Sequence, residues 1–247
     1  MLDFLKNHPF AVESHFDTSL VLTYAVPCEQ LEKFIPECLT LDTFQEKWAF
    51  VAVAMVQTKH LRPKGFPKIL GNDFVLTGYR IFVKYNTSYG KRLRGLYIIK
   101  SETDKTKMAF LGNIFTHYNY TTTDIQFTST HGMIEVHSVK SALSVRVKDD
   151  VMDVSLPSMS PFKDWKEARR FAGPLPFTFT YDAAKKEVLI IEGVREDWVP
   201  TPVEVLESRV GFIESLSLKG AVLANAFVIH NIPYYWKKGK RDLWKPS

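Results

Sequence analysis

The pattern of apolar and polar positions along the chain predicts strands far more often than helices. Residues 16–26 (FDTSLVLTYAV) are rich in β-branched and aromatic side chains and end at a proline. Residues 48–57 begin WAFVAVAMV, which is apolar on both faces, so we expect a central strand covered on both sides. With residues 39–44 and a short polar turn, this strand predicts a hairpin. Further strands are predicted over 74–85, 94–100, 118–128, 132–140, 143–149, 177–181, 187–194, 203–213 and 222–230.

Three segments have helical spacing instead. They cover residues 27–35, residues 104–115 with Asp104 as the candidate N-cap, and residues 161–171, which lie between two proline-containing turns. Many strands with few short helices predict an α+β fold, in which a large antiparallel β-sheet curls into a barrel-like structure. The chain shows no internal repeat and no clear linker, so we expect residues 1–247 to form one domain.

Composition and charge exclude several classes of function. The net charge of +5 comes largely from basic runs at Lys91–Arg94 and Lys237–Arg241, and no nucleic-acid-binding motif accompanies them, so we expect no nucleic-acid partner. No apolar run approaches the length of a membrane span, and the N-terminus lacks a basic leader. We therefore expect a cytoplasmic protein with reduced Cys28 and Cys38. Metal-ligand spacings, phosphate loops and the dinucleotide fingerprint are absent from the sequence, so we expect neither a metal nor a cofactor.

Arg80 is the first candidate for a binding residue. Strict alternation along its strand places it on one face with Leu76, Gly78 and Phe82. A charged group on an apolar face needs an anionic partner if it is buried. That partner could be the carboxylate of a ligand, gripped by two parallel hydrogen bonds, or an internal glutamate such as Glu135 or Glu192. The sequence leaves both open.

A polar and aromatic cluster follows the second predicted helix. It lies within residues 108–139, which contain no lysine or arginine, and alternation sends His117 and Asn119 to one side and Tyr118 and Tyr120 to the other. In a functional interpretation, His117 transfers a proton, the hydroxyl of Tyr120 orients a substrate, and Tyr118 and Asn119 bind the ligand. The alternative is an ordinary hydrogen-bonded edge of the core.

Several segments in a fixed order resemble a known family. They are residues 14–16 (SHF), 35–44 (IPECLTLDTF), 48–54 (WAFVAVA), 61–67 (LRPKGFP) and 79–83 (YRIFV). This order resembles the opening of the bacterial YqjF-like, DUF2071 proteins, which are grouped with the acetoacetate decarboxylase-like superfamily. The resemblance implies a curled antiparallel β-barrel around an internal pocket.

Decarboxylases of that superfamily use a lysine that forms a Schiff base with a keto acid. Here the corresponding segment, Gly112–Tyr120, has no lysine, and Leu76 stands where relatives carry an acid. The sequence therefore argues against Schiff-base decarboxylation.

Three functional hypotheses follow. The first is an internal pocket for a small, anionic organic molecule, with Arg80 holding its carboxylate; such a pocket needs roughly 300 Å³ or more. The second is a non-covalent, lyase-type enzyme that uses His117 as acid and base. The third is a non-catalytic barrel with a structural or partner-binding role, and self-association into a homo-oligomer is compatible with all three.

Overall fold

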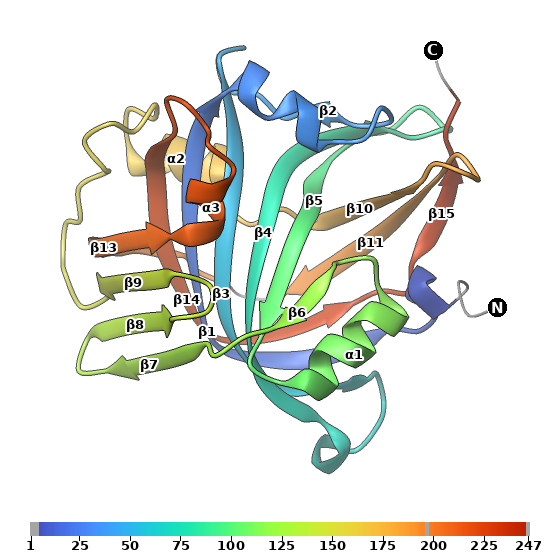
Figure 1. Ribbon diagram of the computed structural model, residues 1–247, viewed down its shortest axis with the longest axis horizontal. Helices are drawn as coiled ribbons and strands as arrows, with labels where there is room; N and C mark the ends of the chain where they lie inside the picture. Colours follow the sequence, from blue (N-terminus) through green and yellow to red (C-terminus); the bar gives the residue numbers. More distant parts are fainter. Residues whose placement is uncertain (1–4, 196–197, 246–247) are drawn as a thin grey trace.

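The chain folds mainly into two β-sheets. The computed structural model describes residues 5–195 and 198–245, and Figure 1 shows its elements in chain order. The larger sheet has eleven strands and the smaller has four. Seven strands carry most of the larger sheet: β1 (Val12–Pro27), β3 (Trp48–Pro63), β4 (Asn72–Asn86), β5 (Arg92–Thr103), β10 (Phe177–Asp182), β11 (Glu187–Arg195) and β14 (Val222–Trp236).

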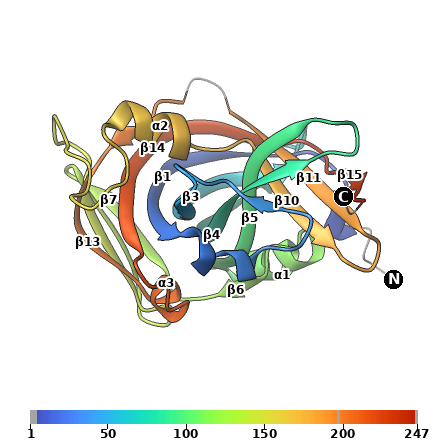
Figure 2. The ribbon, with the colours of Figure 1, turned by 90° about the horizontal axis from the view of Figure 1, so that it is seen from above.

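These seven strands form a closed ring. They pair in the order β14-β1-β3-β4-β5-β10-β11, and β11 then pairs with β14 through residues 193–195 and 234–236. Viewed from above, the strands wrap around a common interior (Figure 2). The α+β fold with a large curled sheet is therefore confirmed. Shorter strands extend the larger sheet: β2 (Thr40–Leu41), β6 (Tyr120–Thr122), β12 (Thr201–Pro202) and β15 (Lys240–Leu243).

The ring differs from the predicted sheet in one respect, because it is not antiparallel throughout. β10 and β6 both pair with β5 in parallel, whereas the other ring pairings are antiparallel. The reason is the long excursion between β5 and β10, because strands joined by a crossover connection can pair in parallel. That excursion builds α1 (Thr106–Phe115), most of the second sheet and α2 (Trp165–Ala172).

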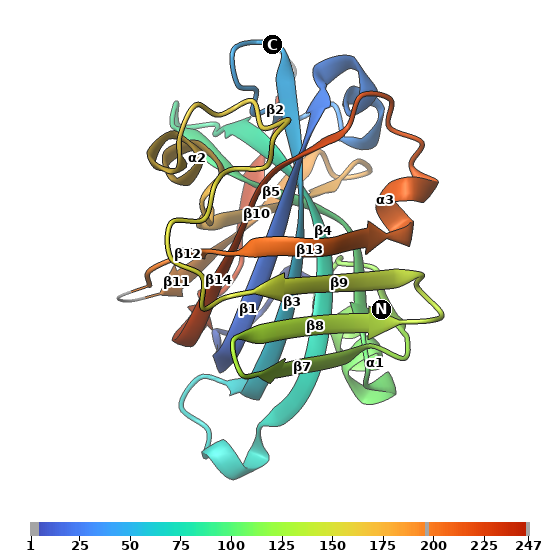
Figure 3. The same cartoon turned by 90° about the vertical axis from the view of Figure 1, so that its left-hand side faces the viewer.

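The second sheet lies across the outside of the ring. Its strand order is β13-β9-β8-β7, and Figure 3 shows these strands running across β1, β3 and β4. Alternation along the ring strands sends residues such as Leu22 and Ile81 outward, where they pack against Ile134 and Val136 of the second sheet. The strands are β7 (Gln126–Thr130), β8 (Met133–Ser138), β9 (Leu143–Lys148) and β13 (Glu204–Val210).

Several local predictions need correction. The expected hairpin of 39–44 with 48–57 is limited to one antiparallel bridge between Phe44 and Trp48, because β1 and β4 occupy both edges of β3, and β2 pairs with β4 instead. The predicted helix over 27–35 is two short 3-10 turns, η2 (Cys28–Gln30) and η3 (Glu32–Phe34). Asp104 does not cap α1, since its carboxylate accepts from the backbone N–H of Val75.

The remaining helical elements are short. They are η1 (Leu5–Asn7), η4 (Lys68–Leu70) and α3 (Gly211–Ser215), and α3 takes the end of the segment predicted as strand 203–213. Among the described helices, none has the length and apolar character that a membrane crossing requires. α1 and α2 lie toward opposite ends of the ring in Figure 1 and contribute to the two ends of its interior.

Candidate functional site

The interior of the ring encloses a cavity of about 120 Å³. All seven ring strands contribute to its lining, and the segment after α2 closes one end. The wall is mostly aliphatic and aromatic, and the cavity is smaller than the roughly 300 Å³ expected of a pocket for a small organic molecule. One lining residue from each ring strand, in chain order, is Ser19, Ala54, Arg80, Ile98, Thr178, Arg195 and Ile229.

Arg80 reaches this cavity from β4. It shares the inner face of the strand with Leu76 and Phe82, as alternation predicts. A Cβ atom at Gly78 would lie only 3.0 Å from Nε of Arg80, so the glycine leaves the space in which the guanidinium folds back over its own strand. The Nε atom is fully buried and has no hydrogen-bond partner among the described residues.

The two glutamates considered as internal partners of Arg80 lie elsewhere. Glu192 forms an ion pair with Lys237, whose Nζ lies 2.8 Å from its carboxylate oxygen. Glu135 is exposed on the second sheet. Neither carboxylate reaches the ring interior, so the internal pairing that the sequence left open is not made by these two residues.

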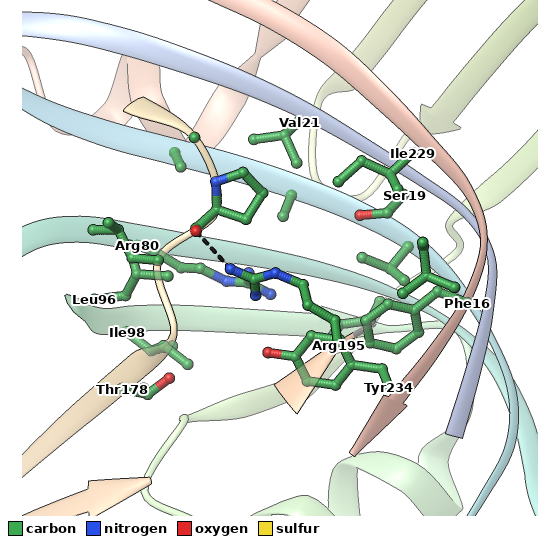
Figure 4. Close-up of a pocket in the computed structure, with 18 of the residues that line it drawn as sticks. Phe16, Ser19, Val21, Arg80, Leu96, Ile98, Thr178, Arg195, Ile229 and Tyr234 are labelled. Carbon is green, nitrogen blue, oxygen red and sulfur yellow. Dashed lines mark hydrogen bonds between the residues drawn. The ribbon is translucent and has the colours of Figure 1, made fainter. Parts of the chain in front are cut away.

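Arg195, at the end of β11, is a second cationic residue of the cavity. Its Nη2 atom donates a hydrogen bond to the carbonyl oxygen of Pro174, and its guanidinium carbon lies 4.9 Å from the centroid of the Trp198 ring. Its Nε atom, like that of Arg80, is buried without a described partner. Figure 4 shows the two guanidinium groups pointing toward one another across the cavity. Arg195 was not predicted from the sequence, although alternation along this strand places it on one face with Leu189, Ile191 and Gly193, which was a usable signal.

Among the residues that the structure describes, no negative charge compensates the two guanidinium groups of the cavity. Within residues 5–195 and 198–245, no aspartate or glutamate forms an ion pair with either arginine. Burial lowers the pKa of Arg80, and the charge of Arg195 lowers it further. An arginine nevertheless stays protonated in proteins, so both charges persist in apolar surroundings. Such an arrangement is costly unless an anion is bound.

Tyr118 and Tyr120 also line the cavity. Tyr118 is buried, and its hydroxyl makes no hydrogen bond of normal geometry with the described residues. The ring of Tyr120 packs directly on Gly112 of α1, where a Cβ atom would come within 2.4 Å of it. Burial raises the pKa of Tyr120 to about 12 and also raises that of Tyr118. Both hydroxyls are therefore neutral near pH 7 and able to donate hydrogen bonds.

The other two residues proposed from the same segment lie outside the cavity. His117 is half-buried in the bend between α1 and β6 and is not among the residues that line the interior. Asn119 is exposed and has a positive φ of 51°. The fold thus brings together Arg80, Tyr118 and Tyr120, but not His117 or Asn119.

Two further observations bear on chemistry at the cavity. Its lining contains no lysine within the described part of the chain. Nor do the described residues include a group of three or more His, Cys, Asp or Glu side chains that could hold a metal ion. His131, in the turn between β7 and β8, and His137, on β8, are both exposed.

Comparison with known proteins places the chain in a family. The model of the DUF2071 family, described as an uncharacterized conserved protein, matches residues 14–233. The chain belongs to the DUF2071 family. Among curated proteins, no sequence matches this DUF2071 chain.

Solved structures share the fold of this DUF2071 protein at low sequence identity. Acetoacetate decarboxylase from Legionella pneumophila aligns with a TM-score of 0.61 and 10% identity, over 94% of this chain and 87% of that one. An acetoacetate decarboxylase-like enzyme from Sphingomonas wittichii RW1 gives 0.61 and 12%, over 96% and 94%. The enduracididine biosynthesis enzyme MppR gives 0.58 and 8%, over 96% and 90%. At these identities the likeness establishes the acetoacetate decarboxylase-like fold alone.

Proposed function

We propose that this DUF2071 protein binds a small organic carboxylate inside the ring, between Arg80 and Arg195. The observation that carries the proposal is the pair of interior guanidinium groups, each with a buried Nε atom that lacks a described partner. A carboxylate has about four acceptor sites on its two oxygens, so it can accept from both arginine forks at once. Its negative charge would offset the two half-buried positive charges.

The cavity limits what can bind. A volume of about 120 Å³ exceeds the space of a single water but falls short of a drug-sized site, so the part of the ligand held between the arginines is compact. The neutral hydroxyls of Tyr118 and Tyr120 offer donors for a second oxygen, such as that of a keto or hydroxy group. Pyruvate is a suitable first probe, since MppR, which shares the fold, is known complexed with pyruvate.

Binding in this cavity would be non-covalent. An imine requires a lysine amine beside the substrate carbonyl, and the described lining offers arginines in its place. A lyase reaction run by His117 has less support, because that imidazole does not line the cavity. A purely structural barrel would be expected to pair its buried arginines internally, which the described ion pairs do not show.

The test is ligand-induced stabilisation with matched arginine variants. Pyruvate, lactate and related small acids are titrated against the wild-type protein, Arg80→Met and Arg92→Met, where Arg92 is an exposed residue of β5. The melting temperature of the wild type should rise with the logarithm of ligand concentration above the dissociation constant.

Arg80→Met should weaken binding at least about tenfold, since hydrogen bonds between charged groups contribute roughly 1.5–3 kcal/mol. Arg92→Met should bind as the wild type does. The proposal fails if no acid stabilises the wild type, or if Arg80→Met binds equally well.

A further inference from the structure

A second cavity lies beneath α1, at one end of the ring, and is called the α1 chamber here. Its volume is about 300 Å³. One face of α1 contributes Met108, Leu111 and Phe115, while Phe10, Leu61 and Phe74 contribute apolar surface from the opposite sides. Aliphatic and aromatic side chains thus dominate its walls, which suits a hydrocarbon group.

The α1 chamber adjoins the arginine-lined cavity. Leu76, Tyr118, Tyr120 and Trp236 line both spaces, so only side chains separate them. The guanidinium of Arg80 lies over Gly78, and Leu76 is the next residue on that face of β4, about 7 Å further along the strand. A molecule held at the guanidinium therefore needs only a short tail to reach the chamber.

The charges in the α1 chamber argue against a second anionic group there. Arg62 is its only positively charged lining residue among those described, and Nη2 of Arg62 lies 2.8 Å from a carboxylate oxygen of Glu13. His8 is buried, and burial lowers its pKa, so it is neutral near pH 7. A second carboxylate would find no available cation in this chamber, whereas a hydrocarbon chain would lose only water contacts.

We infer that the ligand is an amphipathic monocarboxylate, with its carboxylate at Arg80 and Arg195 and its alkyl or aryl tail in the α1 chamber. This inference rests on the proposed function and specifies the class of ligand. The two spaces, of about 120 and 300 Å³, together reach the roughly 300–1,000 Å³ typical of small-molecule sites. The tail passes beside Tyr118 and Tyr120, whose rings form part of the shared wall.

A series of straight-chain acids tests the inference. Acetate, butyrate, hexanoate and decanoate are titrated calorimetrically against the wild type, Arg80→Met, Leu111→Trp and Phe110→Trp. Leu111 lines the chamber, whereas Phe110 is 65% exposed on the same helix and serves as the matched control. Affinity of the wild type should rise roughly fourfold per methylene until the chamber is filled. Leu111→Trp should weaken decanoate binding at least about tenfold and leave acetate unchanged, because added ring volume fills the chamber alone.

The outcomes separate the two proposals. If no acid binds, or if binding survives Arg80→Met, the proposed function fails and this inference falls with it. If acids bind through Arg80 but acetate and decanoate bind equally, the proposed function stands and the inference is overturned. The inference is likewise overturned if Leu111→Trp weakens acetate and decanoate alike, or if Phe110→Trp weakens decanoate as strongly as Leu111→Trp.

A photochemical probe keeps the test independent of the folding of Leu111→Trp. Decanoate with a diazirine at its terminal carbon is bound to the wild type and irradiated, and the modified peptide is identified by mass spectrometry. Adducts on α1 or Phe10 support the inference. Adducts on residues 172–175, which lie at the other end of the interior cavity, would overturn it.

Discussion

The two faces of the ring strands differ in whether their charged side chains have ion-pair partners. On the outer face, toward the second sheet, Glu102 is buried and has an ion-pair partner, since Nζ of Lys100 lies 2.6 Å from it. The hydroxyls of Tyr79 and Ser141 also donate to this carboxylate, at 2.8 and 3.0 Å. On the inner face, Arg80 and Arg195 have no such partner among the described residues. One strand pair, β4 and β5, thus carries a satisfied charge outside and an unsatisfied one inside.

At the rim of the ring, a buried charge also has ion-pair partners, as on the outer face. Asp42 is almost fully buried, and its oxygens lie 2.8 Å from Nζ of Lys84 and 2.5 Å from Nε of Arg94. A charge that serves the fold therefore brings its counterion from the same chain. Among the described residues, Arg80 and Arg195 of the inner face depart from this rule, and both border a cavity, which is why we assign the missing negative charge to a ligand.

The largest effect is expected from breaking the outer cluster. Glu102→Leu removes the acceptor of Tyr79 and Ser141 and the counterion of Lys100, so it should lower the free energy of unfolding by about 3 kcal/mol. Urea denaturation measures this loss. Glu102→Gln keeps the amide oxygen as an acceptor and should lose less. A loss below about 1 kcal/mol for Glu102→Leu would show that the partners of Glu102 contribute little to the free energy of unfolding, which would contradict the contrast between the two faces.

The second-largest effect is expected from alkaline pH, which should lower the free energy of unfolding through a tyrosine of the outer face. Burial raises the pKa of Tyr24 to about 12, and its hydroxyl donates to the carbonyl oxygen of Ser208 on β13. Because the pKa is higher in the folded state, the stabilisation is complete below the unfolded pKa of about 10 and is lost as the pH rises toward 12. The free energy of unfolding should fall by on the order of 2 kcal/mol more in the wild type than in Tyr24→Phe over that range. Equal pH profiles for the two proteins would contradict this assignment.

Local alternation predicted the ring strands well, because each strand has one face toward the interior and one away from it, and on β1, β3 and β4 the outer face lies under the second sheet. It also placed Arg80 on the inner face, since that inference needs only one strand. The end of β14 was missed: the strand continues through Trp236, past Asn231 with its positive φ of 54°, where the aromatic and proline-rich sequence hides the alternation.

Most of the site depends on contacts between distant segments and could not be predicted from single strands. Arg195 meets Arg80 only because β11 pairs with β14 and closes the ring. The exclusion of His117 from the cavity depends on the bend that links α1 to β6, which a pattern of residue types does not reveal. The pairing of 39–44 likewise depended on which strands already occupy the edges of β3.

Removing a charge from the inner face should raise the free energy of unfolding, whereas removing Glu102 from the outer face lowers it. Arg80→Met removes a half-buried cation that has no ion-pair partner among the described residues, and it retains an apolar stem, so the free energy of unfolding without ligand should rise by about 1 kcal/mol. Urea denaturation in buffer free of carboxylates measures this change, and Arg92→Met, at an exposed position, should leave stability unaltered. A loss of stability in Arg80→Met would show that the native protein already pairs this guanidinium, and the contrast between the faces would disappear.

The smallest effect is expected at Gly78, which sets the position of the inner charge. An alanine Cβ would lie 3.0 Å from Nε and 3.1 Å from Nη2 of Arg80, so the guanidinium must move by a few tenths of an ångström. Stability should change by less than about 0.5 kcal/mol, because the entropic gain of alanine over glycine offsets the crowding. Pyruvate affinity should fall by a few-fold, since bidentate recognition depends on the placement of the guanidinium group.

A double-mutant cycle provides the control. In the Arg80→Met background, the substitution at Gly78 has no guanidinium to displace, so the cycle should assign the loss of affinity to the contact between Gly78 and Arg80. An equal loss of stability in both backgrounds would instead indicate that Gly78 matters for strand packing, and that the arginine takes its position from the rest of the cavity wall.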